Sequence, residues 1–461
     1  MATWLEGIAH WLASESGDTI PSEALEAASR HALDSVICAI GGREHEASQG
    51  MLGVLRALGG QGECSVVGEA EGLSVVDAIL ANGTFIRALD CNDFEVRDGQ
   101  IYGHPSDNIA AALAFAELAR ASGLEFLRAI LLGYELYWRL LGRLFRSPAG
   151  RAWDHTSVSG MVAAAMGGLL LGLDEARLTQ ALAIGGCQSY SLAGLRQGEI
   201  SALKASANAR TAASGALAAL LAQSGITGPA ELLEGKGGLL EALGMEAAPD
   251  LRMALTEPVG EHWHLLDVSL KPYPAISTSQ GVIAAALELA QRQRPAAEDI
   301  ERVEVRVVDS HTNREHMADQ ARAWPATRET ADHSLPFLVA AALQDGELGV
   351  AQFEDERWLR GDTRSLMARI SLVADAALNE HAGSTYPAVV TAFMSSGQAL
   401  RSEMLRVPGS PRAPLTPEQL RAKLRRIRPS APGIEGVMEA TSGLATAEDM
   451  QGLGLMLRSL T

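Results

Sequence analysis

The chain has 461 residues, of which 47% are hydrophobic and 20% are charged. These proportions exclude a disordered, collagen-like or low-complexity protein, and from the length we expect two domains. The formal net charge of −18 argues against a nucleic-acid or anionic-membrane partner, because such surfaces select basic proteins. An anionic small substrate stays compatible with this charge if a local basic pocket lies inside the acidic surface.

About the first 240 residues are dominated by Ala, Leu and Gly at helical spacing, which predicts a helical half. Pro21 stands at a natural first-turn position of one helix, and Gly41 and Gly42 end it. Further helices are predicted over 73–89, 107–120, 124–144, 158–173, 175–183 and 201–224. Core packing is the simplest interpretation of their small-residue stripes.

The pattern changes near His262. Residues 263–274 alternate like a strand ended by prolines, and a helix, a strand and a second helix are predicted over 279–293, 300–311 and 334–344. Strands are also predicted over 368–373 and 388–394, which together indicate an α+β domain over 267–396. The last 45 residues are helical again, which fits a return to the first domain.

Four cysteines, at 38, 64, 91 and 187, show no C-x-x-C spacing and are too few for a disulfide framework, so we expect a reducing cytoplasm. The first ten residues lack the basic region of a signal peptide. The longest apolar run, 161–173, falls short of the ~20 residues that a membrane span requires. We therefore predict no membrane helix.

Lysine is the sharpest compositional clue, because the chain has four lysines among 38 basic residues. A lysine that persists in an arginine-rich chain is a candidate for a specific role, since its ammonium is compact and its pKa is tunable. Lys204 lies in an Ala/Ser/Gly helix whose neighbours look buried, and Lys271 ends a predicted strand at the domain junction, where ligand clefts form. Lys423, in KLRRIR, is most simply a solvated position.

Two histidines precede predicted helices in the same manner, His104 in GHPSDNIAAALAF and His155 in WDHTSVSGMVAAA. Helix N-termini attract carboxylates and lower the pKa of a nearby imidazole, which keeps it able to act as a base. Structural histidines near helix caps are the alternative. Asp90 and Asp93 follow a long apolar helix and are interpreted either as solvated C-terminal residues or as acid/base groups.

Several motifs are absent or incomplete. EGKGG at 235–239 lacks the P-loop frame, and no G-x-G-x-x-G follows a strand, which disfavours nucleotide binding. No H-E-x-x-H or G-x-S-x-G occurs, and His262 and His264 have no third ligand in sequence reach. We predict no metal.

Five ordered blocks resemble the MmgE/PrpD family, which includes 2-methylcitrate dehydratase, cis-aconitate decarboxylase and iminodisuccinate epimerase. They are ANGTFIRALDCND with GHPSD, RAWDHTSVSGMVAAAMGGLLLGL, ISALKASANARTAASG with GPAELLEGKGG, LKPYPA with SQ, and RETADHSLPFLVAAALQDG. The resemblance implies a mainly α fold, with a large all-helical domain (1–266 and 397–461), an inserted α+β lid (267–396) and a homodimer. It implies a site between the domains with catalytic Asp90, His104, His155, Lys204 and Tyr273, and with Lys271 and Arg196 binding the substrate.

The chain also departs from the family pattern. Family members commonly carry a histidine or glutamate shortly after the Lys-x-[YF]-P element, where Ile276 and Thr278 stand here without an ionisable group. A threonine common after the aspartate cluster is Phe94, and a tyrosine of the DHSLPY block is Phe337. With these departures, the resemblance specifies the class of reaction better than it specifies the substrate.

The leading hypothesis is a cofactor-independent lyase on a small di- or tricarboxylate, specifically a hydro-lyase resembling 2-methylcitrate dehydratase. The lysines would hold carboxylates, and His104 and His155 would exchange protons with the substrate. Decarboxylase and epimerase activities use the same kind of pocket and stay open. A non-catalytic carboxylate-binding protein is the alternative from another class.

Overall fold

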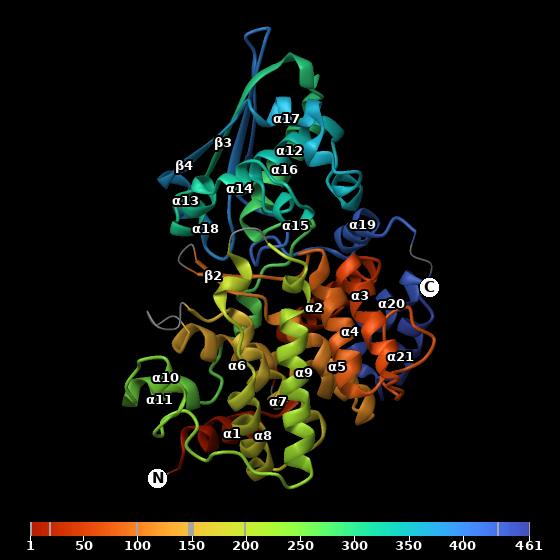
Figure 1. The fold of residues 1–461 in the computed structure, drawn as a ribbon, viewed down its shortest axis with the longest axis vertical. Coiled ribbons are helices and arrows are strands. Elements are labelled where there is room, and N and C mark those ends of the chain that lie inside the picture. Colours follow the sequence, from red (N-terminus) through yellow and green to blue (C-terminus); the bar gives the residue numbers. More distant parts are fainter. Residues whose placement is uncertain are drawn as a thin grey trace.

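The computed structural model describes residues 2–17, 20–97, 100–145, 152–197, 200–430 and 433–460. The predicted mainly α fold is confirmed (Figure 1). Two large hydrophobic clusters form its core. One consists of residues up to Leu270 and from Leu415 onward, and the other of residues between Tyr273 and Leu400. We refer to residues 2–270 and 405–460 as the helical part, and to residues 271–404 as the sheet part.

The helical part consists of long helices rich in small residues. They are α1 (Trp4–Ser14), α2 (Ser22–Gly42), α3 (Glu46–Leu58), α4 (Val75–Ala88), α5 (Ile109–Leu118), α6 (Gly123–Arg143), α7 (Ser159–Leu170), α8 (Glu175–Gln188), α9 (Leu203–Gln223), α10 (Leu239–Ala242) and α11 (Pro249–Thr256). All the helices predicted for this half form, with ends displaced by a few residues. A Cβ on Gly215 of α9 would clash with the backbone oxygen of Gly160 in α7, so these two helices pack backbone to backbone.

The sheet part contains four strands in the order β4-β3-β5-β6. Its elements are α12 (Gln280–Gln293), β3 (Ile300–Val308), α13 (His311–Ala318), α14 (Gln320–Ala323), α15 (Arg328–Ala331), α16 (Leu335–Asp345), α17 (Gly361–Met367), β4 (Ile370–Asp375), α18 (Asn379–Ala382), β5 (Ala388–Met394) and β6 (Ala399–Met404). Strands β3 and β4 are parallel and the other pairs antiparallel. Helices α12 and α16 pack together against the sheet (Figure 1).

Two predictions for this region were wrong. Residues 263–274 do not form a strand. They contain a 3₁₀ helix (His264–Asp267) and a single bridge from Ser269 to Phe94. A ladder does not continue past this bridge, because Pro272 and Pro274 lack a backbone N–H. The sheet also extends past the predicted boundary at 396, since β6 pairs with β5. Strand β6 was missed because its residues, ALRSEM, are mostly polar at the edge of the sheet.

The C-terminal helices α19 (Pro417–Ile427), α20 (Ile434–Ser442) and α21 (Gln451–Arg458) join the core of the helical part. Helices α19 and α20 pack on α2, some 400 residues earlier in the chain (Figure 1). A hairpin of β1 (Glu95–Arg97) and β2 (Gln100–Gly103) lies between α4 and α5 in the sequence. None of the helices in the described residues is long and apolar enough to span a bilayer.

Lys423 of α19 is buried, which corrects the prediction of a solvated position. Its side chain is 0% exposed, and Nζ donates to Asp34 Oδ1 of α2 at 2.5 Å and to the carbonyl oxygen of Cys91 at 2.7 Å. Burial lowers the pKa of Lys423, but Asp34 outweighs this and raises it above the ordinary value. The ion pair of Lys423 and Asp34 therefore attaches the C-terminal segment to the helical part next to Asp90.

We expect Lys423→Met to reduce the free energy of unfolding by about 3–5 kcal/mol, because it leaves the Asp34 carboxylate buried without its cation. Urea unfolding followed by circular dichroism measures this loss. Arg425→Met is the matched control, since Arg425 lies on the same helix with its side chain 66% exposed, and we expect a change below about 0.5 kcal/mol. Equal stability of the two variants would contradict a structural role for the pair.

Candidate functional site

A cavity of about 930 Å³ lies between the helical part and the sheet part. From the helical part it is lined by Asp90, His104, His155 and Lys204, among others, and from the sheet part by Lys271. Five of the residues predicted for the site from sequence therefore border one cavity. Arg196 also lines it, and the role of each residue stays a prediction.

Asp90 sits at the end of α4, where the helix stops because the backbone of Asp90 adopts φ 49°. This left-handed conformation is uncommon for a residue other than glycine and is typical of functional positions. The side chain is buried, which contradicts the interpretation of Asp90 as a solvated C-terminal residue, while its role as an acid/base group stays a prediction. The helix end thus directs a carboxylate into the interior.

Three cationic side chains converge on the Asp90 carboxylate. Oδ1 accepts from Nη1 of Arg87 at 2.5 Å and from Nζ of Lys271 at 2.6 Å, and Oδ2 accepts from Nζ of Lys204 at 2.9 Å. Lys271 also donates to the backbone oxygen of Asp90 at 2.9 Å. The Asp90 carboxylate therefore faces three cations, and this cluster carries an excess of positive charge, although Asp154, Glu315 and Asp319 also line the cavity.

The pKa values in this cluster follow from burial and charge. Burial raises the pKa of Asp90, but Arg87 and the two lysines outweigh it and hold the pKa well below its usual range. Burial lowers the pKa of Lys204 to about 8, although Asp90 opposes this shift, and burial also lowers the pKa of Lys271. Lys204 can therefore gain or lose a proton near physiological pH.

His104 follows β2 and precedes a 3₁₀ helix (Pro105–Asn108). Its Nδ1 lies 2.5 Å from the carbonyl oxygen of Asp93, which can only accept, so Nδ1 carries the proton. Nε2 then accepts from Nη2 of Arg87 at 3.1 Å. Burial, together with Arg87, lowers the pKa of His104 well below the usual value, and the imidazole is neutral at pH 7.

His155 begins a 3₁₀ helix (His155–Val158), and its ring centroid lies 5.3 Å from that of His104. Nδ1 of His155 contacts the hydroxyl of Tyr137 at 3.2 Å. The preceding Asp154 accepts from Nε of Arg196 at 2.6 Å. Burial raises the pKa of Asp154, but His155 and Arg196 lower it below the usual value. An ionised carboxylate thus lies beside His155.

Two predicted residues have other surroundings. Asp93 is 0% exposed and accepts from the backbone N–H of Ser106 at 3.1 Å and from the hydroxyl of Tyr134 at 2.8 Å, so it supports the loop rather than the cavity. Tyr273 is not among the residues that line the cavity, and its ring faces the guanidinium of Arg426 at 5.2 Å. Arg426 lies on α19.

The structure also brings Arg87 and the pair Asp332 and His333 to the site, which sequence reasoning missed. His333 follows α15; its Nδ1 bonds to Asp332, and its Nε2 lies 3.3 Å from Nζ of Lys204 and 3.5 Å from Asp90 Oδ2. Burial and Lys204 lower the pKa of His333 to about 4. The signal that could have revealed this pair is two ionisable residues in the apolar segment TADHSLPF.

Comparison with known proteins agrees with this architecture. The model of the MmgE/PrpD N-terminal domain matches residues 6–252, and that of the MmgE/PrpD C-terminal domain matches residues 273–434. The chain belongs to the MmgE/PrpD family. The resemblance seen in the sequence is thereby confirmed.

Relatives of this MmgE/PrpD protein include a cis-aconitate decarboxylase of Aspergillus terreus, 26% identical over 366 residues, which cover 76% of this chain and 73% of that protein. The cis-aconitate decarboxylase of Mus musculus is 25% identical over 410 residues, with 83% and 78% covered. The 2-methylcitrate dehydratase of Salmonella typhimurium is 26% identical over 341 residues, with 70% and 68% covered. These names describe lyases that act on small carboxylates.

The sheet part of this MmgE/PrpD protein supplies other ionisable groups where residues 275–280 have none. His316 of α13 lines the cavity, and its Nδ1 lies 3.3 Å from the hydroxyl of Thr278. Burial and Arg322 lower the pKa of His316 well below its usual value. A neutral imidazole therefore stands beside Thr278, one of the two positions at which this chain carries no ionisable group.

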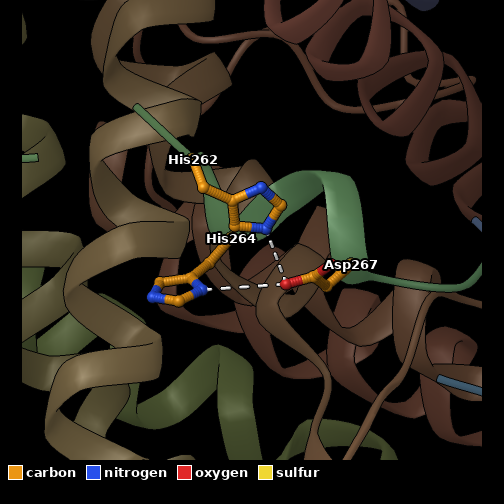
Figure 2. Close-up of side chains that lie close together, drawn as sticks. All are labelled: His262, His264 and Asp267. Atoms are coloured by element: carbon orange, nitrogen blue, oxygen red, sulfur yellow. Dashed lines mark hydrogen bonds and ion pairs between the residues drawn. The ribbon is translucent and has the colours of Figure 1, made fainter. Parts of the chain in front are cut away.

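A cluster outside the cavity corrects one sequence inference. Asp267 is the third group beside His262 and His264, and Figure 2 shows both imidazoles directed at its carboxylate. Nε2 of His262 lies 2.8 Å from Asp267 Oδ2. However, Nη2 of Arg97 lies 2.8 Å from Nδ1 of His264 and 3.1 Å from Asp267 Oδ2, so a guanidinium already bridges these two groups and a metal would have to displace it.

The excess positive charge predicts that the cavity binds tricarballylate, a tricarboxylate with neither a hydroxyl group nor a double bond. We expect its affinity to fall as the pH rises through about 8, because Lys204 then loses its charge. Lys204→Met should weaken binding by roughly tenfold or more and remove this pH dependence. Isothermal titration calorimetry measures both effects.

Lys236→Met is the matched control, because Lys236 is exposed and should leave the affinity and its pH profile unchanged. Tricarballylate affinity that is insensitive to Lys204→Met would remove Lys204 from the binding surface.

Proposed function

We propose that the protein is a cofactor-independent lyase that removes a proton next to a carboxylate of a small di- or tricarboxylate, specifically a hydro-lyase of the 2-methylcitrate dehydratase kind. The observation that carries this proposal is the single Asp90 carboxylate shared by Arg87, Lys204 and Lys271. A buried wall with surplus positive charge favours a substrate with several negative charges.

The same wall would stabilise the reaction's intermediate. Removing a proton next to a carboxylate moves negative charge onto the carboxylate oxygens. Preorganised cations in a site shielded from water stabilise that charge without reorganising. Lys204, Lys271 and Arg87 all line the cavity. We assign Lys204 to this role, and we assign Lys271 and Arg87, which both donate to Oδ1 of Asp90, to neutralising that carboxylate and adding positive charge beside Lys204.

The two imidazoles have different charged neighbours. His104 is neutral, because burial and Arg87 disfavour its charged form, and it is our candidate for the base; its Nε2 would take the proton in place of the hydrogen bond that it accepts from Arg87. His155 lies beside the ionised Asp154, and it is our candidate for the acid that protonates the leaving hydroxyl. Pairs of groups with opposed environments are the usual basis for such a division.

Decarboxylation is the second candidate, and the similarity to several cis-aconitate decarboxylases favours it. The same cations would stabilise the charge left when a carboxylate departs as CO₂, and an acid would then protonate the carbon. Epimerisation would return the proton to the opposite face.

We further propose that the sheet part is a lid over the site and that the protein is a cytoplasmic homodimer.

Purified protein incubated separately with 2-methylcitrate, citrate, cis-aconitate and iminodisuccinate distinguishes these activities through release of unsaturated acid, CO₂ or epimerised product. We expect turnover of at least one compound, and a loss of on the order of 10²-fold or more in Lys204→Ala, as for one preorganised charge stabiliser. Lys236→Ala should behave like the parent protein. Binding of these acids with no turnover and no exchange of solvent deuterium would support a non-catalytic binding protein instead.

For the histidines, we expect His104→Gln and His155→Gln each to abolish most turnover while tricarballylate affinity changes little, because the lysines remain. The parent's kcat/KM should fall at acid pH as the base becomes protonated, with this limb below pH 6.5, since the pKa of His104 is lowered. Steady-state kinetics from pH 4.5 to 9 test both statements. His10→Gln, with His10 69% exposed, is the control, and normal kinetics with reduced thermal stability in both site variants would assign the histidines a purely structural role.

A further inference from the structure

His333 and Asp332 form a second buried unit that reaches the site from the sheet part. Both side chains are nearly inaccessible, with 6% and 3% exposure. The pair follows α15, and the backbone N–H of Ile276 donates to the carbonyl oxygen of Asp332 at 3.0 Å, which ties it to the segment after Lys271. Neither residue has a role in the chemistry derived above.

The order of hydrogen bonds fixes which nitrogen of His333 carries the proton. Asp332 contacts Nδ1, and an ionised carboxylate accepts, so Nδ1 donates to it. Nε2 is then an acceptor, and Nζ of Lys204, 3.3 Å away, is a donor that fits it. Asp332 therefore sets the tautomer that lets His333 accept from Lys204.

An ammonium group has three N–H donors. Lys204 directs one to Asp90 Oδ2 at 2.9 Å and one to Nε2 of His333. The two acceptors belong to different parts of the molecule, Asp90 to the helical part and His333 to the sheet part. Among the described residues these are the hydrogen-bond partners of Nζ, and the third N–H is available to the cavity that Lys204 lines.

We propose that Asp332 and His333 are positioning residues that hold the Lys204 ammonium between the two parts of the protein and direct its remaining N–H at a substrate carboxylate. The pair acts through Lys204 and extends the proposed function to residues that bring the sheet part into the site. Its closing test uses ligand binding, which does not require turnover.

The charged groups around Lys204 give the proposal a measurable consequence. Asp90 and Asp332 favour its charged form, whereas Arg87 and Arg196 oppose it. A neutral His333 that accepts from Lys204 also favours the ammonium. Loss of this acceptor should therefore let Lys204 lose its proton at a lower pH, whereas a merely structural histidine would leave that titration in place.

The experiment measures tricarballylate affinity by calorimetry from pH 6 to 10 in the parent protein, His333→Phe and His333→Gln. Phenylalanine fills the space without an acceptor, and the glutamine amide oxygen can still accept from Lys204. In His333→Phe we expect the pH at which binding weakens to fall by about one to two units, as for one hydrogen bond to a charged group. His333→Gln should restore most of the parent's profile, and His381→Phe, at an exposed position, should match the parent.

Asp332→Asn keeps the imidazole and serves if His333→Phe does not fold. Its amide can stabilise the other tautomer, with the proton on Nε2, and it also removes the negative charge that favours the Lys204 ammonium, so we expect a shift in the same direction. An unchanged pH profile in the folded variants would overturn the proposal, as would a shift in His333→Gln equal to that in His333→Phe. If the shifts occur and no acid in the substrate panel turns over, the proposed lyase function fails while the positioning role stands.

Discussion

The site depends on one carboxylate that three cations share. Asp90 holds Arg87, Lys204 and Lys271 within 2.5–2.9 Å in an interior where a cation without a partner would be costly. The carboxylate therefore makes it possible to bury three positive charges together. Because it neutralises one of them, the cluster keeps a surplus of positive charge at the cavity wall.

The rest of the fold supports this arrangement from several directions. The left-handed backbone at Asp90 ends α4 at the point where the carboxylate is needed. Lys423, from the last segment of the chain, donates to the carbonyl of the next residue, Cys91. Lys271 and His333 come from the sheet part and reach the same carboxylate. The left-handed backbone at Asp90 is thus held by contacts from the C-terminal segment and from the sheet part.

Much of this could be predicted where the signal is local. The helical half follows from periodicity, and Lys204 and Lys271 stand out because lysine is scarce in the chain. Lys423 could not be placed, because its partner Asp34 lies 389 residues away and KLRRIR has the charge of a solvated face. His333 was missed for a related reason. Asp90 follows α4 and Lys204 lies in α9, and only the packed structure brings them to His333.

The most direct measurement of whether the shared carboxylate creates an anion site is a crystal structure of the protein with tricarballylate bound. The surplus charge predicts one ligand carboxylate inside the cavity, within about 3.2 Å of Nζ of Lys204, while Asp90 keeps its contacts with Arg87 and Lys271. A complex in which the ligand lies away from Lys204, or in which Asp90 has released its cations, would contradict this.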